Sequence, residues 1–190
     1  LSENSYIATS DSDCMILDKL FNELIELPNY SEIKRKDDLV YVKLNGKWGI
    51  DTSDGKVLIS PQYDDIFDIC DDWVKVENNG KFGYVNVMTD EKIETKFVNG
   101  SDFQEGYAWV TEKTFTGAID TKGNYIVKPI YWAYDDDTGF GCNYFSHGVT
   151  SVRRHKDSSY EIINKKGQRL TNEKYQYVSA FNSSGVAYFI

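Results

Sequence analysis

The sequence predicts an all-β fold made of a tandem repeat of about five three-stranded antiparallel β-meander units. One interval of 34 residues separates three valines, Val42, Val76 and Val110. The same interval separates two pairs of an aromatic residue and a glycine, Trp48-Gly49 and Phe82-Gly83. Between these positions, short runs of β-branched and aromatic residues alternate with Asn-Gly and Asp-Gly pairs, which is typical of strands joined by hairpins.

The first unit, residues 5–36, is a degenerate copy of this pattern. Met15-Ile16-Leu17-Asp18 stands where a later unit has Gly117-Ala118-Ile119-Asp120. Apolar residues at helical spacing between Leu17 and Ile25, with Pro28 after them, also fit an amphipathic helix. We expect strands, with the helix as the alternative, because terminal repeats are usually atypical.

The second unit, residues 37–70, shows the pattern most clearly, with turns at Asn45-Gly46 and at Ser53-Asp54-Gly55. Pro61, and Pro129 in a later unit, lack an amide hydrogen, so we expect them to stop the third strand and start the return loop. We expect the Trp48 ring to stack on the neighbouring unit. Gly49 beside it is expected to permit a close backbone approach or a bulge.

The remaining units cover residues 71–104, 105–146 and 147–182, and a partial strand covers 183–190. The fourth interval is longer by ten residues, of which eight fall between Trp132 and Tyr144 and two between Arg153 and Ser159. The final strand either caps the array or marks a cut through a longer protein. We expect one array over residues 1–190, arranged as an open superhelical stack or, alternatively, as a closed propeller-like ring.

Composition excludes several classes of protein. The chain has 190 residues, 41% of them hydrophobic, and its formal net charge is −9. It has no apolar run of about 20 residues, so no membrane span is expected, and an acidic surface disfavours nucleic acid. The charge is uneven, because residues 1–144 hold 14 basic and 27 acidic side chains whereas residues 145–190 hold seven and three.

The residues that carry chemistry in other proteins form no recognisable motif here. Three scattered cysteines do not make a disulfide framework, and two histidines stand outside the repeated positions. The recurring Asp51, Asp54 and Asp120 are assigned to turns, where carboxylates cap backbone amides. We therefore expect no enzyme, no catalytic residue, no metal and no cofactor.

The insertion in the fourth unit and the basic segment after it are the candidate contact region. Asp135 and Asp137 could share a face toward calcium, but their spacing fails the EF-hand pattern. A solvated loop or a loop that contacts a partner is the remaining interpretation. The candidate partner contacts are Tyr134, Asp135, Asp136, Asp137, Phe140, Tyr144, Arg153 and Arg154.

The repeated residues resemble a known family. Gly46-Lys47-Trp48-Gly49-Ile50-Asp51 and the segment from Asp54 to Asp64 are similar to the bacterial WG repeat, also called the KWG repeat. Lys81–Asn86 and Gly117–Gly123 are similar as well, although Phe82 and Phe115-Thr116 replace the tryptophan. The resemblance implies a β-rich repeat scaffold with roles in binding and no catalytic residues.

From the resemblance and the absence of catalytic motifs, we expect a non-catalytic binding or scaffolding module whose partner is a protein. A cell-surface carbohydrate is the alternative, because the 14 Tyr and 4 Trp of the chain could stack on sugar rings. The compartment stays open between the bacterial cell surface, secretion and the cytoplasm.

Overall fold

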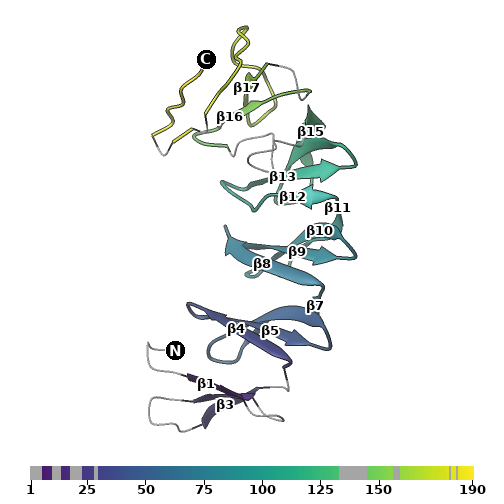
Figure 1. Cartoon of the computed structure of the whole chain (residues 1–190), viewed down its shortest axis with the longest axis vertical. Coiled ribbons are helices and arrows are strands. Elements are labelled where there is room, and N and C mark those ends of the chain that lie inside the picture. Colours follow the sequence, from purple (N-terminus) through teal and green to yellow (C-terminus); the bar gives the residue numbers. More distant parts are fainter. Residues whose placement is uncertain are drawn as a thin grey trace. The chain divides into compact units, whose positions relative to one another are not determined.

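The computed structural model is built from β-strands and turns, and its described residues contain no helix (Figure 1). The structure describes the backbone of residues 6–9, 14–17 and 23–27, and describes residues 30–132, 145–155, 159–179, 181–182 and 184–190 in full. Accordingly, nothing in this part of the chain offers a long apolar helix of the kind that crosses a membrane. The all-β prediction is confirmed.

The chain divides into two compact units, one formed by residues 1–67 with 76–79 and the other by 68–75 with 80–190. The first unit begins with an antiparallel sheet in the order β1-β2-β3, with strands β1 (Tyr6–Thr9), β2 (Cys14–Leu17) and β3 (Glu23–Leu27). These strands show that the alternative of a helix for this segment is wrong.

The next sheet contains four strands rather than the predicted three. Its order is β4-β5-β6-β7, with β4 (Glu32–Lys36), β5 (Leu39–Leu44), β6 (Lys47–Thr52) and β7 (Val57–Tyr63). The additional strand is β4, which pairs with β5 so that Ile33 stands opposite Val42. Asp37, with a φ of 53°, makes the turn between them, and an Asp-Asp turn is not one of the Asn-Gly or Asp-Gly signals.

The following sheets repeat this order. The third is β11-β10-β9-β8, and the division between the two compact units falls within β8 and β9. Its strands are β8 (Asp65–Cys70), β9 (Trp73–Asn78), β10 (Lys81–Asn86) and β11 (Lys92–Phe97). The fourth contains β12 (Asn99–Gly100), β13 (Tyr107–Glu112), β14 (Phe115–Asp120) and β15 (Tyr125–Trp132). The fifth pairs β16 (Val149–Val152) with β17 (Glu161–Asn164).

The 34-residue period is a period of buried positions. Val42, Val76 and Val110 are each at most 1% exposed, and Val152, which follows the insertion, is 0% exposed. Each stands in the second strand of its four-stranded sheet or, for Val152, in β16. The predicted limits of the units and their arrangement as an open stack or a closed ring stay predictions.

The two prolines lie inside strands, so the prediction that they end the third strand is wrong. Pro61 is in β7 and Pro129 is in β15. Opposite Pro61, the pairing jumps from Trp48–Tyr63 to Ile50–Ile59, which leaves Gly49 facing a bulge. Because the proline occupies the bulge, its missing amide hydrogen removes no bond from the ladder. The bulge itself is what the repeated glycine predicted.

Among the described residues, the aromatic rings that contact one another do not include the ring of Trp48. In the second compact unit, the Trp73 ring stacks on that of Phe103 with centroids 5.0 Å apart. One repeat later, Tyr107 contacts Phe145 at 5.8 Å. Trp48 instead carries Lys34 and Lys43 over its ring, at 4.5 and 5.0 Å. The Trp48 ring therefore contacts lysines of its own sheet, and the prediction that it stacks on the neighbouring unit is wrong.

Polar side chains hold the turns, with one exception among the three recurring aspartates. Asp120 Oδ1 accepts hydrogen bonds from the backbone N–H groups of Lys122 and Asn124, at 2.9 and 2.8 Å, as predicted. Asp54 also lies in a turn and accepts a bond from the Thr52 hydroxyl. Asp51, however, lies in β6 and is only 2% exposed, so its assignment to a turn is wrong.

Candidate binding groove

A groove of about 570 Å³ lies in the second compact unit, beside the turn that joins β13 to β14. Its walls come from the start of β10, from β12, from the end of β13 with its turn, and from the end of β15. The lining residues are Phe82, Val98, Asn99, Thr111, Lys113, Thr114 and Trp132. The volume is within the range of sites that take a small ligand or a side chain of a partner.

Aromatic and aliphatic side chains form the body of the groove. Phe82 stands opposite Phe97 across β10 and β11 and is half-buried. Trp132 stands opposite Phe115 across β14 and β15. Val98 is 41% exposed and Phe115 is 40% exposed. The groove therefore presents apolar surface to solvent that the fold itself does not bury, as binding surfaces do.

The turn beside the groove departs from the repeat. The equivalent turns of the two preceding sheets are Asn45-Gly46 and Asn79-Gly80, and all four residues have positive φ, as a type I′ hairpin requires. Thirty-four residues further on, the pair is Lys113-Thr114. Lys113 keeps a φ of 56°, a conformation that disfavours an ordinary side chain by about 1 kcal/mol. The exception to the turn rule thus coincides with the groove.

The polar groups of the groove are hydrogen-bond donors. Asn99 Oδ1 accepts the Gly100 N–H at 2.8 Å, which leaves the Nδ2 donors for a ligand. Lys113 is the only charged residue among the lining residues that the structure describes, and it has no ion-pair partner there. Thr111 is already bonded, because its hydroxyl lies 2.9 Å from that of Thr116.

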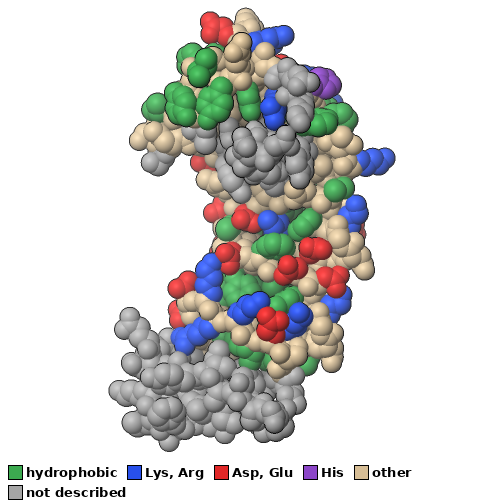
Figure 2. Space-filling model, viewed as in Figure 1, with side chains coloured by type: hydrophobic (Ala, Val, Ile, Leu, Met, Phe, Trp, Pro, Cys, Tyr) green, Lys and Arg blue, Asp and Glu red, His purple; other side chains and the backbone are tan. Residues whose placement is uncertain are grey.

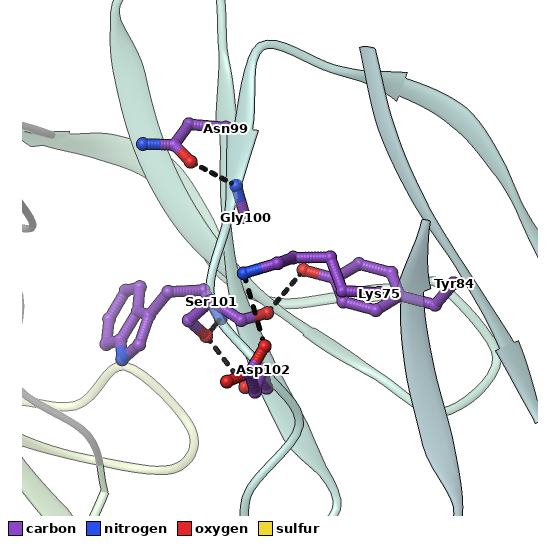
Figure 3. A network of polar contacts seen from close by, with 7 residues as sticks. Lys75, Tyr84, Asn99, Gly100, Ser101 and Asp102 are labelled. Atoms are coloured by element: carbon purple, nitrogen blue, oxygen red, sulfur yellow. Dashed lines mark hydrogen bonds and ion pairs between the residues drawn. The ribbon is translucent and has the colours of Figure 1, made fainter. Parts of the chain in front are cut away.

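A network of polar contacts fixes the wall that carries Asn99 (Figure 3). The Tyr84 hydroxyl donates to the Ser101 carbonyl at 2.7 Å, and the Trp109 N–H donates to Ser101 Oγ at 3.0 Å. Lys75 Nζ lies 3.2 Å from Asp102 Oδ1. Tyr84 and Lys75 come from the third sheet and Trp109 from the fourth. This wall is therefore held from both sheets and is preformed.

Contacts between successive turns add to this rigidity. Asp71 Oδ2 accepts the Gly106 N–H at 3.3 Å, and one repeat later Glu105 Oε1 accepts the His147 N–H at 3.4 Å. Lys165 Nζ is 2.9 Å from Glu105, and its hydrogen bond holds the pKa of Glu105 below the usual range. The acidic residue of each turn thus ties that turn to the next one.

The sequence-predicted contact residues divide into two groups. Six of them lie outside the described residues: Tyr134, Asp135, Asp136, Asp137, Phe140 and Tyr144. Arg153 and Arg154 are described and make internal contacts. The Arg153 guanidinium lies 5.5 Å from the Tyr160 ring centre, and that of Arg154 lies 5.7 Å from Tyr131.

Arg154 Nε is also 3.7 Å from Glu161 Oε2. On the face drawn in Figure 2, acidic and basic side chains are interspersed around small hydrophobic patches. The backbone of Arg153 lies beside the groove residue Trp132, because the Trp132 N–H donates to the Arg153 carbonyl at 2.8 Å.

Sequence reasoning missed the groove itself. It used Phe82 as a repeat marker and Trp132 as the start of the insertion, and it did not single out Val98, Asn99 or Lys113. The available signal was the replacement of Asn-Gly by Lys113-Thr114 in an otherwise regular turn position.

Among the described residues, no group of three or more His, Cys, Asp or Glu side chains is placed to hold a metal ion.

Comparison with solved structures gives several similar chains of low identity. The N-terminal domain of Nup159 is 9% identical, with a TM-score of 0.38 over 86% of this chain and 56% of that one. Hsv2 from Kluyveromyces lactis is 8% identical, with a TM-score of 0.42 over 85% and 57%. Virginiamycin B lyase from Staphylococcus aureus is 13% identical, with a TM-score of 0.37 over 98% and 84%. The chain thus spans little more than half of the first two.

No relative was found among curated protein sequences. A family model does match, and its description is WG containing repeat. The matched segments are residues 50–82 and 117–132. Of the three repeated glycines, Gly117 opens the second segment, and Gly49 and Gly83 directly flank the first. The resemblance seen in the sequence is therefore confirmed over these two segments.

Proposed function

We propose that this chain is a non-catalytic binding module of a bacterial WG-repeat protein, that its partner is a protein, and that the groove beside Lys113 is a contact site. The observation that carries the proposal is an apolar groove of about 570 Å³ whose Asn99 wall is preformed. Grooves of this kind are the usual places where a protein accepts a ligand or the side chains of a partner.

The repeated residues support a scaffold rather than a catalyst, because each has a structural role. Gly49 faces a bulge, Val76 is buried, and Asp120 closes a turn. The fold therefore explains these three recurring residues without a catalytic role. The departure from the repeat at Lys113 is where a specific role would enter.

A carbohydrate ligand has less support. Sugar recognition would use exposed aromatic rings, and three of the four tryptophans are buried: Trp48 is 7%, Trp73 is 3% and Trp109 is 2% exposed. Trp132 alone faces the groove, where aliphatic and aromatic neighbours surround it. This composition fits an apolar side chain of a protein partner better than a hydroxyl-rich sugar.

Cross-linked capture with the full chain as bait tests the proposal. Val98→Asp places a charge in the groove, and Val57→Asp places the same charge on β7, where Val57 is 52% exposed. We expect one protein captured by the native chain and by the Val57→Asp variant and lost with Val98→Asp. Equal capture by both variants would show that the groove is not the contact site.

Two further variants separate the groove from the other predicted contact region. One lacks residues 134–144, and the other carries Arg153→Gln and Arg154→Gln. Loss of capture with either variant, while Val98→Asp still captures, assigns the contact to the insertion or the arginines instead. Thermal unfolding of each variant distinguishes loss of binding from loss of folding.

A further inference from the structure

The floor of the groove is apolar, and polar side chains lie at its rim. Phe82 and Trp132 supply aromatic surface, and Val98 adds aliphatic surface. The Lys113 amine and the Asn99 amide nitrogen can each donate hydrogen bonds to a ligand, and the Thr114 hydroxyl can donate or accept one. The complementary ligand is an apolar group with a hydrogen-bond acceptor of negative charge beside it.

The number of positively charged side chains at the rim indicates whether a phosphate or a carboxylate fits the groove. A phosphate group is usually held by several arginines or by a set of backbone N–H groups, whereas this groove has one amine, that of Lys113, among its described lining residues. Glu112, the nearest acid in the sequence, is not a lining residue. A single carboxylate matches one amine and two neutral donors.

The apolar surface continues beyond the groove. Ile130 lies two residues before Trp132 in β15 and is 41% exposed. Phe115, opposite Trp132, is 40% exposed. A small organic acid would fill the groove and leave these side chains uncovered, whereas a polypeptide that ends in the groove can cover them.

We propose that the groove binds the C-terminal end of a partner polypeptide, with the apolar side chain of the last residue against Phe82 and Trp132 and the terminal carboxylate at Lys113. In a C-terminal residue the carboxylate and the side chain branch from the same Cα, so both fit one groove. This inference rests on the proposed function and specifies the partner's chemistry, and capture of free carboxylates is a known mode of peptide recognition.

Titration of the ¹⁵N-labelled full chain with two dipeptides tests the inference by NMR. The probes are N-acetyl-Leu-Phe with a free carboxylate and the same dipeptide with a C-terminal amide. We expect saturable shifts of the Trp132 indole N–H and of the Lys113 and Thr114 amides, with the free acid binding at least about tenfold more tightly than the amide, as loss of a charge-assisted hydrogen bond implies.

Matched substitutions assign the preference to Lys113. Lys113→Gln is expected to lower the affinity for the acid to that for the amide, and Lys122→Gln, an exposed lysine in another turn, is expected to leave both affinities unchanged. Lys113 stands in an exposed turn, so its variant should fold, and the same spectra show whether it does. Equal affinities for acid and amide, or no saturable shift at these residues, would overturn the inference.

The outcome is separable from that of the capture experiment. If the dipeptides fail to bind while Val98→Asp still abolishes capture, the groove binds another part of a protein, so the proposed function stands and the terminal-carboxylate inference falls. If the acid binds preferentially while Val98→Asp captures normally, the groove is a ligand site but not the contact with the captured protein.

Discussion

The repeated glycines occupy positions where no other residue fits. A Cβ atom at Gly49 would lie 2.4 Å from the Ile59 carbonyl oxygen and 2.7 Å from the Pro61 nitrogen, and equivalent approaches of 2.5 and 2.4 Å occur at Gly83 and Gly117. The obstacles are backbone atoms, which cannot move without breaking the bulge. The glycine of the WG motif is therefore required by sterics rather than by turn geometry.

Gly49→Ala is expected to lower the free energy of unfolding by about 3 kcal/mol, because the new methyl group forces the bulge apart. Gly46→Ala is the control, because no atom lies within 4 Å of its Cβ position and only its φ of 79° is unfavourable. Its expected loss is about 1 kcal/mol. Urea unfolding measures both, and equal losses would contradict the steric account.

Asp51 is a buried carboxyl group with one hydrogen-bond donor. The Tyr30 hydroxyl donates to Oδ2 at 2.8 Å, and Oδ1 has no partner. Burial raises the pKa of Asp51, and the Tyr30 bond partly opposes the rise. A raised pKa in the folded state means that this group's stabilising contribution is complete below its unfolded pKa of about 3.9 and is lost as the pH rises through the folded pKa.

Tyr30→Phe removes the donor to the charged form of Asp51. The expected loss of unfolding free energy is about 2 kcal/mol at a pH above the raised pKa of Asp51, where the carboxylate is ionised, and clearly smaller at pH 3, where it is protonated. Chemical denaturation at both pH values measures the difference. In an Asp51→Asn background the substitution should cost the same at both pH values, and a pH-independent loss in the native background would refute the assignment.

At the scale of elements, the sequence predicted hairpins wherever a turn contained glycine and missed the strand that precedes each group. Glu32–Lys36 contains one apolar residue, Ile33, among four charged ones, so no alternation marks it as a strand. Its partner strand β5 supplies the hydrogen bonds and the apolar side chains. An edge strand with charged side chains is stable in a sheet and also resists aggregation.

Hydrogen exchange distinguishes a four-stranded sheet from a three-stranded one. The amides of Glu32–Lys36 that pair with β5 are expected to exchange more slowly than those of Asp37 and Asp38 in the turn, by about tenfold or more. A three-stranded unit would leave residues 32–36 in a loop with fast exchange throughout. NMR measurement of exchange rates for individual amides gives the comparison directly.

At the scale of the whole molecule, the period of the sequence predicted the all-β fold and the bulges beside the repeated glycines, because each depends on residues within one repeat. The groove depends on side chains 50 residues apart in the sequence, Phe82 and Trp132, which meet only in the folded chain. No pattern within one repeat relates residues that lie so far apart in the sequence. What the sequence does contain is the departure of Lys113-Thr114 from the Asn-Gly rule.

In the proposed function, that departure exchanges stability for a binding site, because the Asn-Gly pair favours the turn and the lysine supplies the charge of the groove. Natural proteins often retain such unfavourable residues at functional positions. We propose that the regular repeats serve as the scaffold and that the irregular turn supplies the specificity.

Restoring the regular turn tests this account most directly. In the variant with Lys113→Asn and Thr114→Gly, the urea-unfolding free energy is expected to rise by about 1 kcal/mol, while the free-acid dipeptide loses its preference over the amide in the NMR titration. A variant that is less stable than the native chain, or one that keeps the preference for the free acid, would contradict the account.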